Sequence, residues 1–321
     1  MAGTPVYFGR KYRLTLYPPG QEAKVFEVQA GKPAMDIKFD VTYARGQTAR
    51  EGTISILGLG HRTIHEFISL AAMARGEAMC RKVRVVLEAG YFSTAGMIQI
   101  LNGFVWYATV TSPPQMWLNM KVSEYDPAGG KKTSFDRMQP LAMRPMLETV
   151  LARYSTIEGD GDASLMPFKV VDKTQDSIVD SSTETKDCPL LGKGDLTLGE
   201  AVQILSSDLS DTVSFTLRSS RIDRTRQLEC LDKDKKKVAP GKIVKVDKDH
   251  GLLSVTGIDA VNGCITTFLD GRIDDELSHM VLTSELNQQA NGKYYIIKKQ
   301  YVGHFMGQEW YSRYFCSARE E

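Results

Sequence analysis

The sequence lacks a paired-cysteine pattern, a long apolar run and an excess of charge of either sign. Its five cysteines are odd in number, far apart and never in a Cys-x-x-Cys arrangement: Cys80, Cys188, Cys230, Cys264 and Cys316. This usage indicates reduced thiols in a cytoplasm rather than a disulfide framework. No stretch reaches the roughly 18 apolar residues that a membrane span needs, and the first residues do not resemble a secretory signal. We therefore expect a soluble, cytosolic protein without membrane insertion.

The near balance of charge excludes one class of function and favours another. The chain has 40 basic and 39 acidic residues, a formal net charge of +1. A dedicated nucleic-acid binder usually carries a marked basic excess. The lysine-rich run from Lys233 to Lys248 is interleaved with aspartates and lacks aromatic residues, which is typical of a solvated interdomain loop. A surface close to neutrality repels its own copies little, and this suits a protein that assembles.

Two motifs look like ligand sites but are incomplete. The segment from Ile54 to Gly60 mimics a dinucleotide-binding turn, yet Thr63 stands where the third glycine of that fingerprint belongs. His61 and His65 are four residues apart, but the order His-Arg-Thr-Ile-His-Glu is not that of a metalloprotease, and no third ligand is evident nearby. A plain strand-turn-helix junction with surface histidines is the simpler interpretation.

Acidic runs and catalytic motifs give no firmer sign of chemistry. The runs Glu158–Asp162 and Asp232–Asp234 do not have the ligand spacing of a calcium loop. Paired carboxylates could serve a glycosidase, but one sequence gives no way to place two of them across a cleft. No Gly-x-Ser-x-Gly elbow, Walker loop or Cys–His pairing is present. We expect no catalytic residue, no cofactor and no metal site.

Period-2 patterns dominate the first 125 residues. Between Ile37 and Tyr43, apolar residues alternate with polar ones, as a half-buried strand requires, and the same alternation runs from Met116 to Val122. Further strand candidates are Tyr12–Tyr17, Lys24–Val28, Gly52–Leu57, Lys82–Glu88 and Met97–Thr109. Short strands separated by Gly and Pro indicate a closed or nearly closed antiparallel sheet. One helix interrupts them, with a capping box at Thr63 and Glu66 and a stop at Gly76.

The middle of the chain has a different pattern. Pro145 suits the first position of a helix, and Thr197 with Glu200 forms a capping box that opens a second helix. Two short strands follow, at Val213–Leu217 and Arg226–Leu231. The polar stretch Asp172–Asp195 between the helices predicts a long surface loop, ordered by a partner if at all.

Strand patterns return after the breaker Pro240-Gly241. The expected strands are Ile243–Val246, Leu252–Thr256, Cys264–Leu269, Met280–Leu286, Tyr294–Val302 and Glu309–Ser317. The fold class is therefore α+β and mainly β, with two small tube-type antiparallel β-barrels flanking a small α/β domain. The expected domains are residues 1–130, 131–239 and 240–321.

Three stretches carry a family pattern. The first is Asp36–Leu59, two strands around a polar turn that lead into a helix. The second is Glu88-Ala89-Gly90-Tyr91, followed by the strand segment Ile100–Val105. The third is Asn291–Ile296, then His304, Gly307 and Trp310. In this order and spacing, the chain resembles the tail hub family of contractile-tailed bacteriophages, which is related to the hub portion of type VI secretion spike proteins.

The chain departs from the family pattern in two places. Family members commonly have an Asn-Leu-Ser-like turn where this chain has Gly58-Leu59-Gly60. Asn102-Gly103 replaces the Phe-Gly pair of the family's hairpin. The resemblance covers the two β-rich ends well and the middle only by position.

The resemblance implies two tube-like barrels per subunit, so that three subunits present six quasi-equivalent domains. Such a homotrimer would adapt a hexameric tail tube to a three-fold central spike in the virion baseplate. Expected partners are the tail tube or distal tube protein, the spike, and the baseplate wedge and tape-measure proteins. Phage DNA would pass through the lumen without specific binding. Alternatives are another tail-tube or spike-joining component, and a cell-wall-degrading baseplate enzyme.

Aromatic residues near barrel edges are the candidates for subunit interfaces, because rigid apolar side chains are favoured there. For any one of them, a core or singly exposed position is the alternative. The candidate interface residues are Tyr91, Phe92, Trp106, Trp117, Tyr294 and Trp310.

Overall fold

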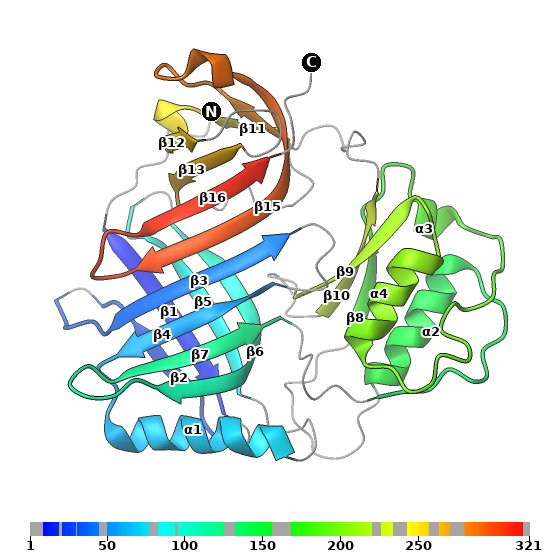
Figure 1. The fold of residues 1–321 in the computed structure, drawn as a ribbon, viewed down its shortest axis with the longest axis horizontal. Helices are drawn as coiled ribbons and strands as arrows, with labels where there is room; N and C mark the ends of the chain where they lie inside the picture. Colours follow the sequence, from blue (N-terminus) through cyan, green and yellow to red (C-terminus); the bar gives the residue numbers. More distant parts are fainter. Residues whose placement is uncertain are drawn as a thin grey trace.

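The computed structural model describes most of the chain, in twelve segments. These are residues 9–18, 21–29, 31–44, 50–76, 83–93, 96–124, 132–155, 168–219, 226–233, 243–256, 263–269 and 279–316. The described part is mainly β, with one large sheet and one small mixed sheet (Figure 1). The mainly β class predicted from alternation is confirmed.

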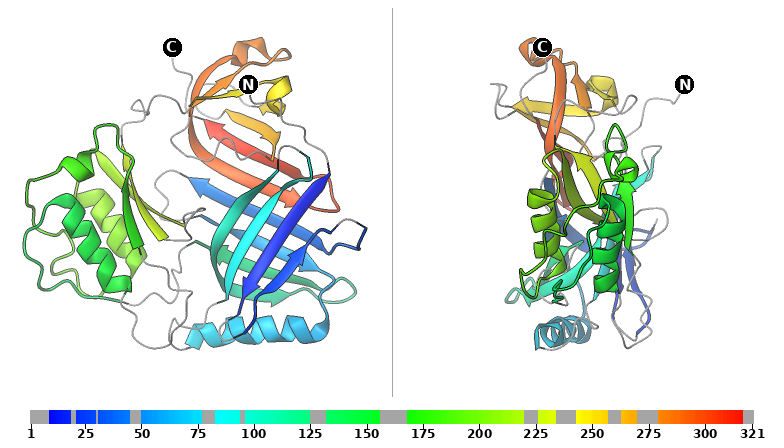
Figure 2. Two further views of the ribbon diagram at one scale, coloured as in Figure 1. Left: turned by 180° about the vertical axis from the view of Figure 1, so that it is seen from behind. Right: turned by 90° about the vertical axis from the view of Figure 1, so that its right-hand side faces the viewer.

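The large sheet begins with the strands predicted from the first 125 residues, nearly at their predicted bounds. They are β1 (Arg10–Tyr17), β2 (Lys24–Glu27), β3 (Asp36–Ala44), β4 (Glu51–Leu57), β5 (Arg84–Tyr91), β6 (Met97–Val110) and β7 (Trp117–Ser123). They pair antiparallel in the spatial order β3-β4-β7-β6-β5-β1-β2. In two views, β3, β4 and β7 form one layer, and β5 and β1 lie behind it (Figures 1 and 2).

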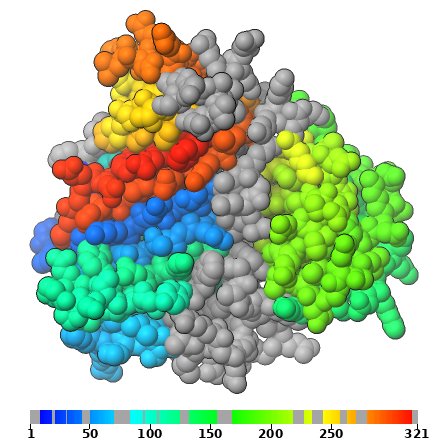
Figure 3. Space-filling model, in the orientation of Figure 1, coloured from blue at the N-terminus to red at the C-terminus, as the bar shows by residue number. Residues whose placement is uncertain are grey.

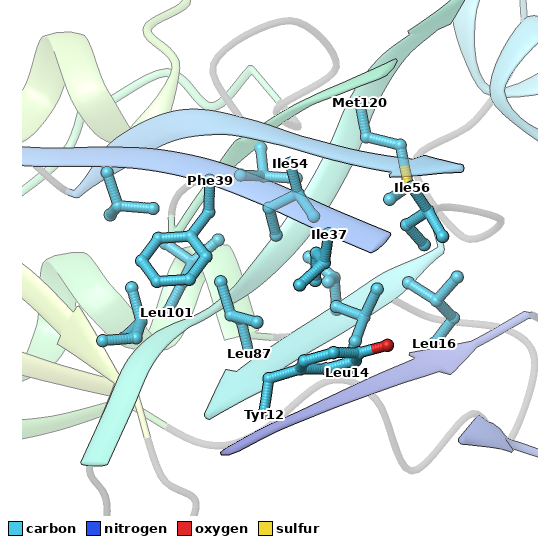
Figure 4. Close-up of a cluster of buried hydrophobic side chains, with 14 of the residues drawn as sticks. Tyr12, Leu14, Leu16, Ile37, Phe39, Ile54, Ile56, Leu87, Leu101 and Met120 are labelled. Carbon is cyan, nitrogen blue, oxygen red and sulfur yellow. The ribbon is translucent and has the colours of Figure 1, made fainter. Parts of the chain in front are cut away.

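The first hydrophobic core lies between these two layers. It contains Leu14, Ile37, Ile54, Leu87 and Met120, each at most 1% exposed, and the close-up shows their side chains pointing toward one another (Figure 4). Each comes from a different strand, at the positions where alternation turns an apolar residue inward. The period-2 pattern therefore predicted both the strands and their buried faces.

The prediction of two separate small β-barrels, each closed or nearly closed, is corrected by the sheet topology. A barrel in the first part of the chain would need β3 to pair with β1 or β2. Instead β3 pairs with β15 (Gly292–His304) near the other end of the chain. In the described strands, the large sheet is thus an open path that ends at β2 on one side and at β12 (Leu252–Thr256) on the other.

Helix α1 (His61–Gly76) lies beside the first strands (Figure 1). Ile64 and Phe67 are buried in the first core, as the helical periodicity predicted. The predicted capping box is wrong, because the helix begins at His61, before Thr63, and the Glu66 carboxylate instead pairs with the Lys24 ammonium.

The middle of the chain forms a three-stranded mixed sheet with helices packed against it. Its strands are β8 (Phe168–Asp172), β9 (Val213–Ser219) and β10 (Arg226–Asp232); its helices are α2 (Met143–Ser155), α3 (Ile178–Ser181) and α4 (Leu198–Asp208). β10 pairs antiparallel with β9 and parallel with β8. Strand β8 was not predicted. The α4 capping box between Thr197 and Glu200 is confirmed, whereas Pro145 is the third residue of α2 rather than the first.

The stretch Asp172–Asp195 is more ordered than the polar composition predicted. The Asp172 carboxylate accepts backbone hydrogen bonds from Thr174, Val179 and Asp180, at 2.9, 2.8 and 2.9 Å. This carboxylate holds the start of α3 against the end of β8. Further along, Cys188 and Leu190 are buried in the core of the small sheet. The expectation of a loop ordered only by a partner is therefore wrong for this segment.

The last part of the chain completes the large sheet. Its elements are β11 (Ile243–Val246), η2 (Lys248–His250), β12, β13 (Cys264–Phe268), β14 (His279–Leu282), η3 (Gln288–Ala290), β15 and β16 (Trp310–Cys316). β12, β13, β16 and β15 pair antiparallel in that order, and β14 pairs with both β15 and β11. A third core includes Ile265, Met280 and Tyr314. The predicted strand Met280–Leu286 ends at Leu282.

Several sequence-based expectations fall outside the described residues. They concern the breaker Pro240-Gly241, the acidic run Glu158–Asp162, most of the lysine-rich run, Cys80 and the Trp106 side chain. The boundaries expected near residues 130 and 239 also fall there. The domain division thus stays a prediction.

Candidate assembly site

Strand pairing between β3 and β15 joins the first and last β-rich parts of the chain. The antiparallel register runs from Lys298 opposite Ala44 to His304 opposite Lys38, seven residue pairs in all. This junction makes the two parts one continuous sheet, and it is the feature around which the family-like residues gather.

Aromatic packing fills the core side of the junction. Gly303 lies directly against the Phe39 ring, and a Cβ on Gly303 would come within 2.2 Å of the ring atom Cζ. Trp310 is 3% exposed and meets Phe39 edge to face, with ring centroids 5.3 Å apart. Its indole N–H donates to the carbonyl of Gly90 on β5, at 3.2 Å. The indole thus connects the β3–β15 junction with β5 in the layer behind it.

The contact between Gly303 and Phe39 gives a testable pair. Gly303→Ala is expected to lower the free energy of unfolding by about 1–3 kcal/mol, because the buried ring leaves no room for the added methyl group. Adding Phe39→Leu should restore part of the loss, since the smaller side chain vacates the contested space. Urea denaturation of both single variants and the double variant measures this coupling. Strictly additive effects would contradict the packing described above.

The three family-like stretches, far apart in sequence, meet at this junction. Asp36 belongs to the first, Gly90 and Tyr91 to the second, and His304 with Trp310 to the third. The Tyr91 hydroxyl also accepts a hydrogen bond from the backbone N–H of Leu269, at 3.3 Å.

Arg10 organises the turn between β15 and β16. Its guanidinium lies 5.7 Å from the centre of the Trp310 ring. It donates hydrogen bonds to four carbonyl oxygens of the turn, those of His304, Phe305, Gly307 and Gln308. A guanidinium presents five donors in a fixed fork, so one side chain can satisfy several carbonyls of a tight turn at once.

Asp36 holds the same turn from the other side. One carboxylate oxygen lies 2.9 Å from His304 Nε2, and the other accepts the Met306 backbone N–H at 3.1 Å. The Phe305 N–H donates to the carbonyl of Ile37 at 2.9 Å. The turn is therefore fixed by contacts to both β1 and β3, whereas no local pattern in the sequence signals Arg10 or Asp36.

The other face of the large sheet spans six strands and is mainly polar, although the register also places Trp117, Val302, Tyr311 and Phe315 on it. In the orientation of Figure 3, these strands lie at the surface as adjacent bands without a helix over them. The outward residues include four cations and two carboxylates among uncharged polar groups: Lys38, Asp40, Thr42, Glu51, Thr53, Ser55, Asn119, Lys121, Thr266, Lys298, Gln300 and Arg313. We call these twelve residues the polar sheet face.

Several charged residues of the polar sheet face make contacts with neighbouring side chains. The Gln300 amide donates to both Asp40 carboxylate oxygens, at 2.8 and 3.0 Å. The Lys38 and Lys298 ammonium groups lie over aromatic rings, at 4.1 Å from the Trp117 centroid and 5.0 Å from that of Phe315. Such contacts hold cations close to the sheet instead of projecting them into solvent.

The candidate interface aromatics separate into buried and accessible residues. Tyr91, Tyr294 and Trp310 are buried within the chain, each at most 5% exposed. Phe92 is 50% exposed and Trp117 is half-buried. Burial within one chain does not test contacts between subunits, so the interface stays a prediction for all six candidates; Phe92 and Trp117 are the two that the described part of the chain leaves accessible.

The incomplete ligand motifs take ordinary structural positions. Gly58 has a φ of +95°, a left-handed conformation that favours glycine, and Leu59 packs into the first core. His61 and His65 are both exposed on α1. Within the twelve described segments, no group of three or more His, Cys, Asp or Glu side chains could hold a metal ion. None of the helices described has the length and apolar character needed to cross a bilayer.

The buried cysteines are expected to react slowly, because burial disfavours their thiolate forms. Burial and the nearby Asp172 carboxylate raise the pKa of Cys230, while burial with a smaller contribution from Cys264 raises the pKa of Cys316 to about 12. At pH 8 the native protein should react with iodoacetamide at the half-exposed Cys264 well before Cys230 or Cys316. Peptide mass spectrometry after timed labelling measures this order, and equal rates in the native state would contradict it.

The raised thiol pKa of Cys316 also sets a pH dependence. The unfolded chain loses this proton near pH 9, whereas the native state keeps it to about pH 12. The unfolded state therefore binds fewer protons between these values, and the contribution of Cys316 to stability falls as the pH rises through this range.

Comparisons with known proteins place this arrangement in a known fold. No protein-family model and no curated protein sequence matches the chain. A 43 kDa tail protein of prophage MuSo2 from Shewanella oneidensis superposes with a TM-score of 0.56 at 9% identity, covering 96% of each chain. The chain has the fold of a phage tail protein.

Two other solved structures extend this tail-protein fold. A tail protein from Neisseria meningitidis matches with a TM-score of 0.52 at 10% identity, over 97% of each chain. An E. coli type VI secretion component, described as similar to the T4 tail proteins gp27 and gp5, matches with a TM-score of 0.53 at 8% identity. That match covers 95% of this chain and 77% of the other. The resemblance predicted from the three sequence stretches is confirmed by this shared fold.

Proposed function

We propose that this chain is a structural, non-enzymatic subunit of the baseplate hub of a contractile phage tail. Three copies would close into a ring that joins the hexameric tail tube to the three-fold spike. The observation that carries the proposal is the six-strand polar sheet face on a fold that covers 96% of a phage tail protein. The residue ranges 1–130 and 240–321 would supply the two tube-type parts, and 131–239 the mixed domain between them.

The polar sheet face is proposed to line the channel. A passage for DNA needs a hydrated surface that does not hold phosphate groups tightly. Asp40 and Glu51 partly offset the cations of this face, and aromatic rings hold the Lys38 and Lys298 ammonium groups. DNA affinity in the submicromolar range with a steep salt dependence would contradict this role.

Ring closure is proposed to involve the open edges of the large sheet. Edge strands expose backbone groups that can pair with another chain. The terminal strands β2 and β12 each carry an exposed apolar residue, with Val25 52% and Leu253 45% exposed. Pairing between copies would complete the barrel-like tubes that a single chain leaves open. A head-to-tail contact of this kind forms a ring when its rotation closes.

The proposed setting is the virion baseplate, assembled in the host cytoplasm. Beyond its own copies, the partners would be the tube or distal tube protein, the spike, and the wedge and tape-measure proteins.

The molecular mass of the protein, measured alone and together with its tail partners, tests the hub assignment. Three copies per assembled particle are expected, because a hub must match a three-fold spike. Six copies would support a tube-type ring, and a single copy in the assembled tail would rule out both. The free protein by itself is not decisive, since a hub can trimerise on assembly.

A zymogram separates the structural role from the enzymatic alternative. The purified protein is expected to leave a peptidoglycan gel uncleared. A cleared band that disappears when a pair of carboxylates is replaced would establish a cell-wall-degrading enzyme instead.

A further inference from the structure

We infer that the end of the large sheet beside the β15–β16 turn docks an acidic surface of the tail tube protein. The surface consists of Lys11, Lys38, Phe92, Trp117 and Met306, and we call it the hairpin rim. This inference rests on the proposed function, because it assigns the tube contact to these residues.

The hairpin rim presents apolar side chains that the chain itself leaves uncovered. Met306 at the tip of the turn is 64% exposed, Phe92 is 50% exposed, and Trp117 is half-buried. Contacts through the turn link these side chains. Arg10 binds the turn carbonyls, Arg10 pairs with Tyr91 next to Phe92, and the Trp117 ring meets His304 at 6.3 Å.

The turn that carries Met306 is held in one conformation before any partner binds. The Arg10 guanidinium satisfies four of its carbonyls, and Asp36 accepts the Met306 N–H itself. Gly307 packs so closely on the His304 ring that a Cβ there would lie 2.2 Å from Nδ1. An apolar side chain on a fixed turn loses little conformational entropy on binding, which is the property of an interface anchor.

The charges of the hairpin rim determine the chemistry of its partner. The Lys11 ammonium lies 5.0 Å from the Phe92 ring centroid, and that of Lys38 lies 4.1 Å from the Trp117 centroid. The Asp36 carboxylate is engaged by His304 and Met306, which leaves the exposed Glu309 at the end of the turn as the acidic group of this region. A protein surface with carboxylates around a shallow apolar pocket complements this arrangement. Nucleic acid fits less well. Two lysines whose ammonium groups lie over aromatic rings offer few contacts to phosphates, and a phosphate backbone has no apolar pocket to receive the Met306 side chain.

The position of the hairpin rim favours the ring of the tail tube as its binding partner over another copy of this chain. Strand β7 runs from Trp117 at the rim to Ser123, and the chain then continues to the small mixed sheet, which lies at the opposite side of the molecule (Figure 1). If the polar sheet face lines the channel, the rim is at one mouth and the mixed domain is at the other. Contacts from rim to mixed domain between copies would tend to propagate as an open filament instead of closing.

Binding to the purified tail tube protein encoded by the same phage tests the inference. Biolayer interferometry at 150 mM and at 500 mM NaCl would compare the wild type with Met306→Asp and with the double variant Lys11→Glu/Lys38→Glu. Controls place comparable changes elsewhere: Leu286→Asp replaces a fully exposed apolar residue, and Lys193→Glu reverses one lysine of the mixed domain. Circular dichroism melts establish that all variants remain folded.

We expect Met306→Asp to weaken binding about 30-fold. The double lysine variant should weaken it about tenfold at low salt and less at high salt. The controls should bind like the wild type.

Wild-type affinity in the rim variants, or no binding by the wild type, would overturn the inference. The number of copies in the assembled particle is a separate measurement. If it is three and the rim variants still bind the tube protein like the wild type, the hub assignment stands and only the assignment of the hairpin rim is rejected. DNA binding that the double lysine variant alone abolishes would identify a nucleic-acid surface instead and also overturn the inference.

Discussion

Replacing Trp310 by alanine is expected to lower the free energy of unfolding by about 3–5 kcal/mol. The indole is 3% exposed and contacts the rings of Phe39 and Phe305, with centroids 5.3 and 6.3 Å away. Its removal would leave a cavity at the point where β3 and β15 join the two β-rich parts, and would leave the Gly90 carbonyl without its indole donor. Guanidinium denaturation followed by far-UV circular dichroism measures the loss.

Two variants show whether this effect belongs to the junction. Trp310→Phe keeps most of the ring volume and should cost much less, mainly the hydrogen bond to Gly90. Trp117→Ala removes a tryptophan of equal size from a half-buried position and should cost less than Trp310→Ala. If Trp310→Ala cost no more than Trp117→Ala, the junction would not depend on the buried indole.

Replacing Glu124 by alanine is expected to destabilise the protein by about 3–5 kcal/mol, because it removes one partner of a buried ion pair. Glu124 and Arg50 are each 5% exposed, with Arg50 Nε 3.8 Å from Glu124 Oε1. Arg50 retains a hydrogen bond to the carbonyl of Ile100 at 3.2 Å, which does not neutralise its charge. The same denaturation experiment measures the change.

The double variant Arg50→Met/Glu124→Leu separates buried charge from packing. Removing both charges and keeping side-chain volume should recover much of the stability lost in Glu124→Ala. Lys121→Ala, an exposed residue of β7 three positions before Glu124, serves as the control and should change the stability by less than about 0.5 kcal/mol. A double variant as unstable as Glu124→Ala would mean that the carboxylate acts through contacts other than Arg50.

Local sequence patterns predicted most of the strands of the large sheet. Ile37, Phe39, Val41 and Tyr43 are all buried, as their alternation with polar residues predicted. This succeeds because alternation records which face of a strand meets a core, whichever strand lies next to it. Strand β8 was missed because Phe168–Asp172 is short, without clear alternation, and adds to its sheet by parallel pairing with a strand far along the chain.

The candidate interface residues illustrate a different limit. Tyr91, Tyr294 and Trp310 were selected as large aromatics near strand ends, and all three are buried within the chain. Cores and interfaces both favour such side chains, so residue type alone does not separate them. The hairpin rim could not be found this way, because Met306 is a single residue and the Arg10 and Asp36 that hold its turn are hundreds of positions away.

By itself, the sequence determined most strands of the large sheet, their buried faces, the capped helix α4, and a resemblance carried by three separated stretches. Only the tertiary structure decided that β3 pairs with β15, so that the described strands of the two β-rich parts form one open sheet instead of two separate barrels. The physical reason is that alternation specifies the inward face of a strand but not its neighbour. Neighbours are chosen by contacts such as Gly303 on Phe39 and the Trp310 indole on Gly90, between residues too distant in sequence to leave a local pattern.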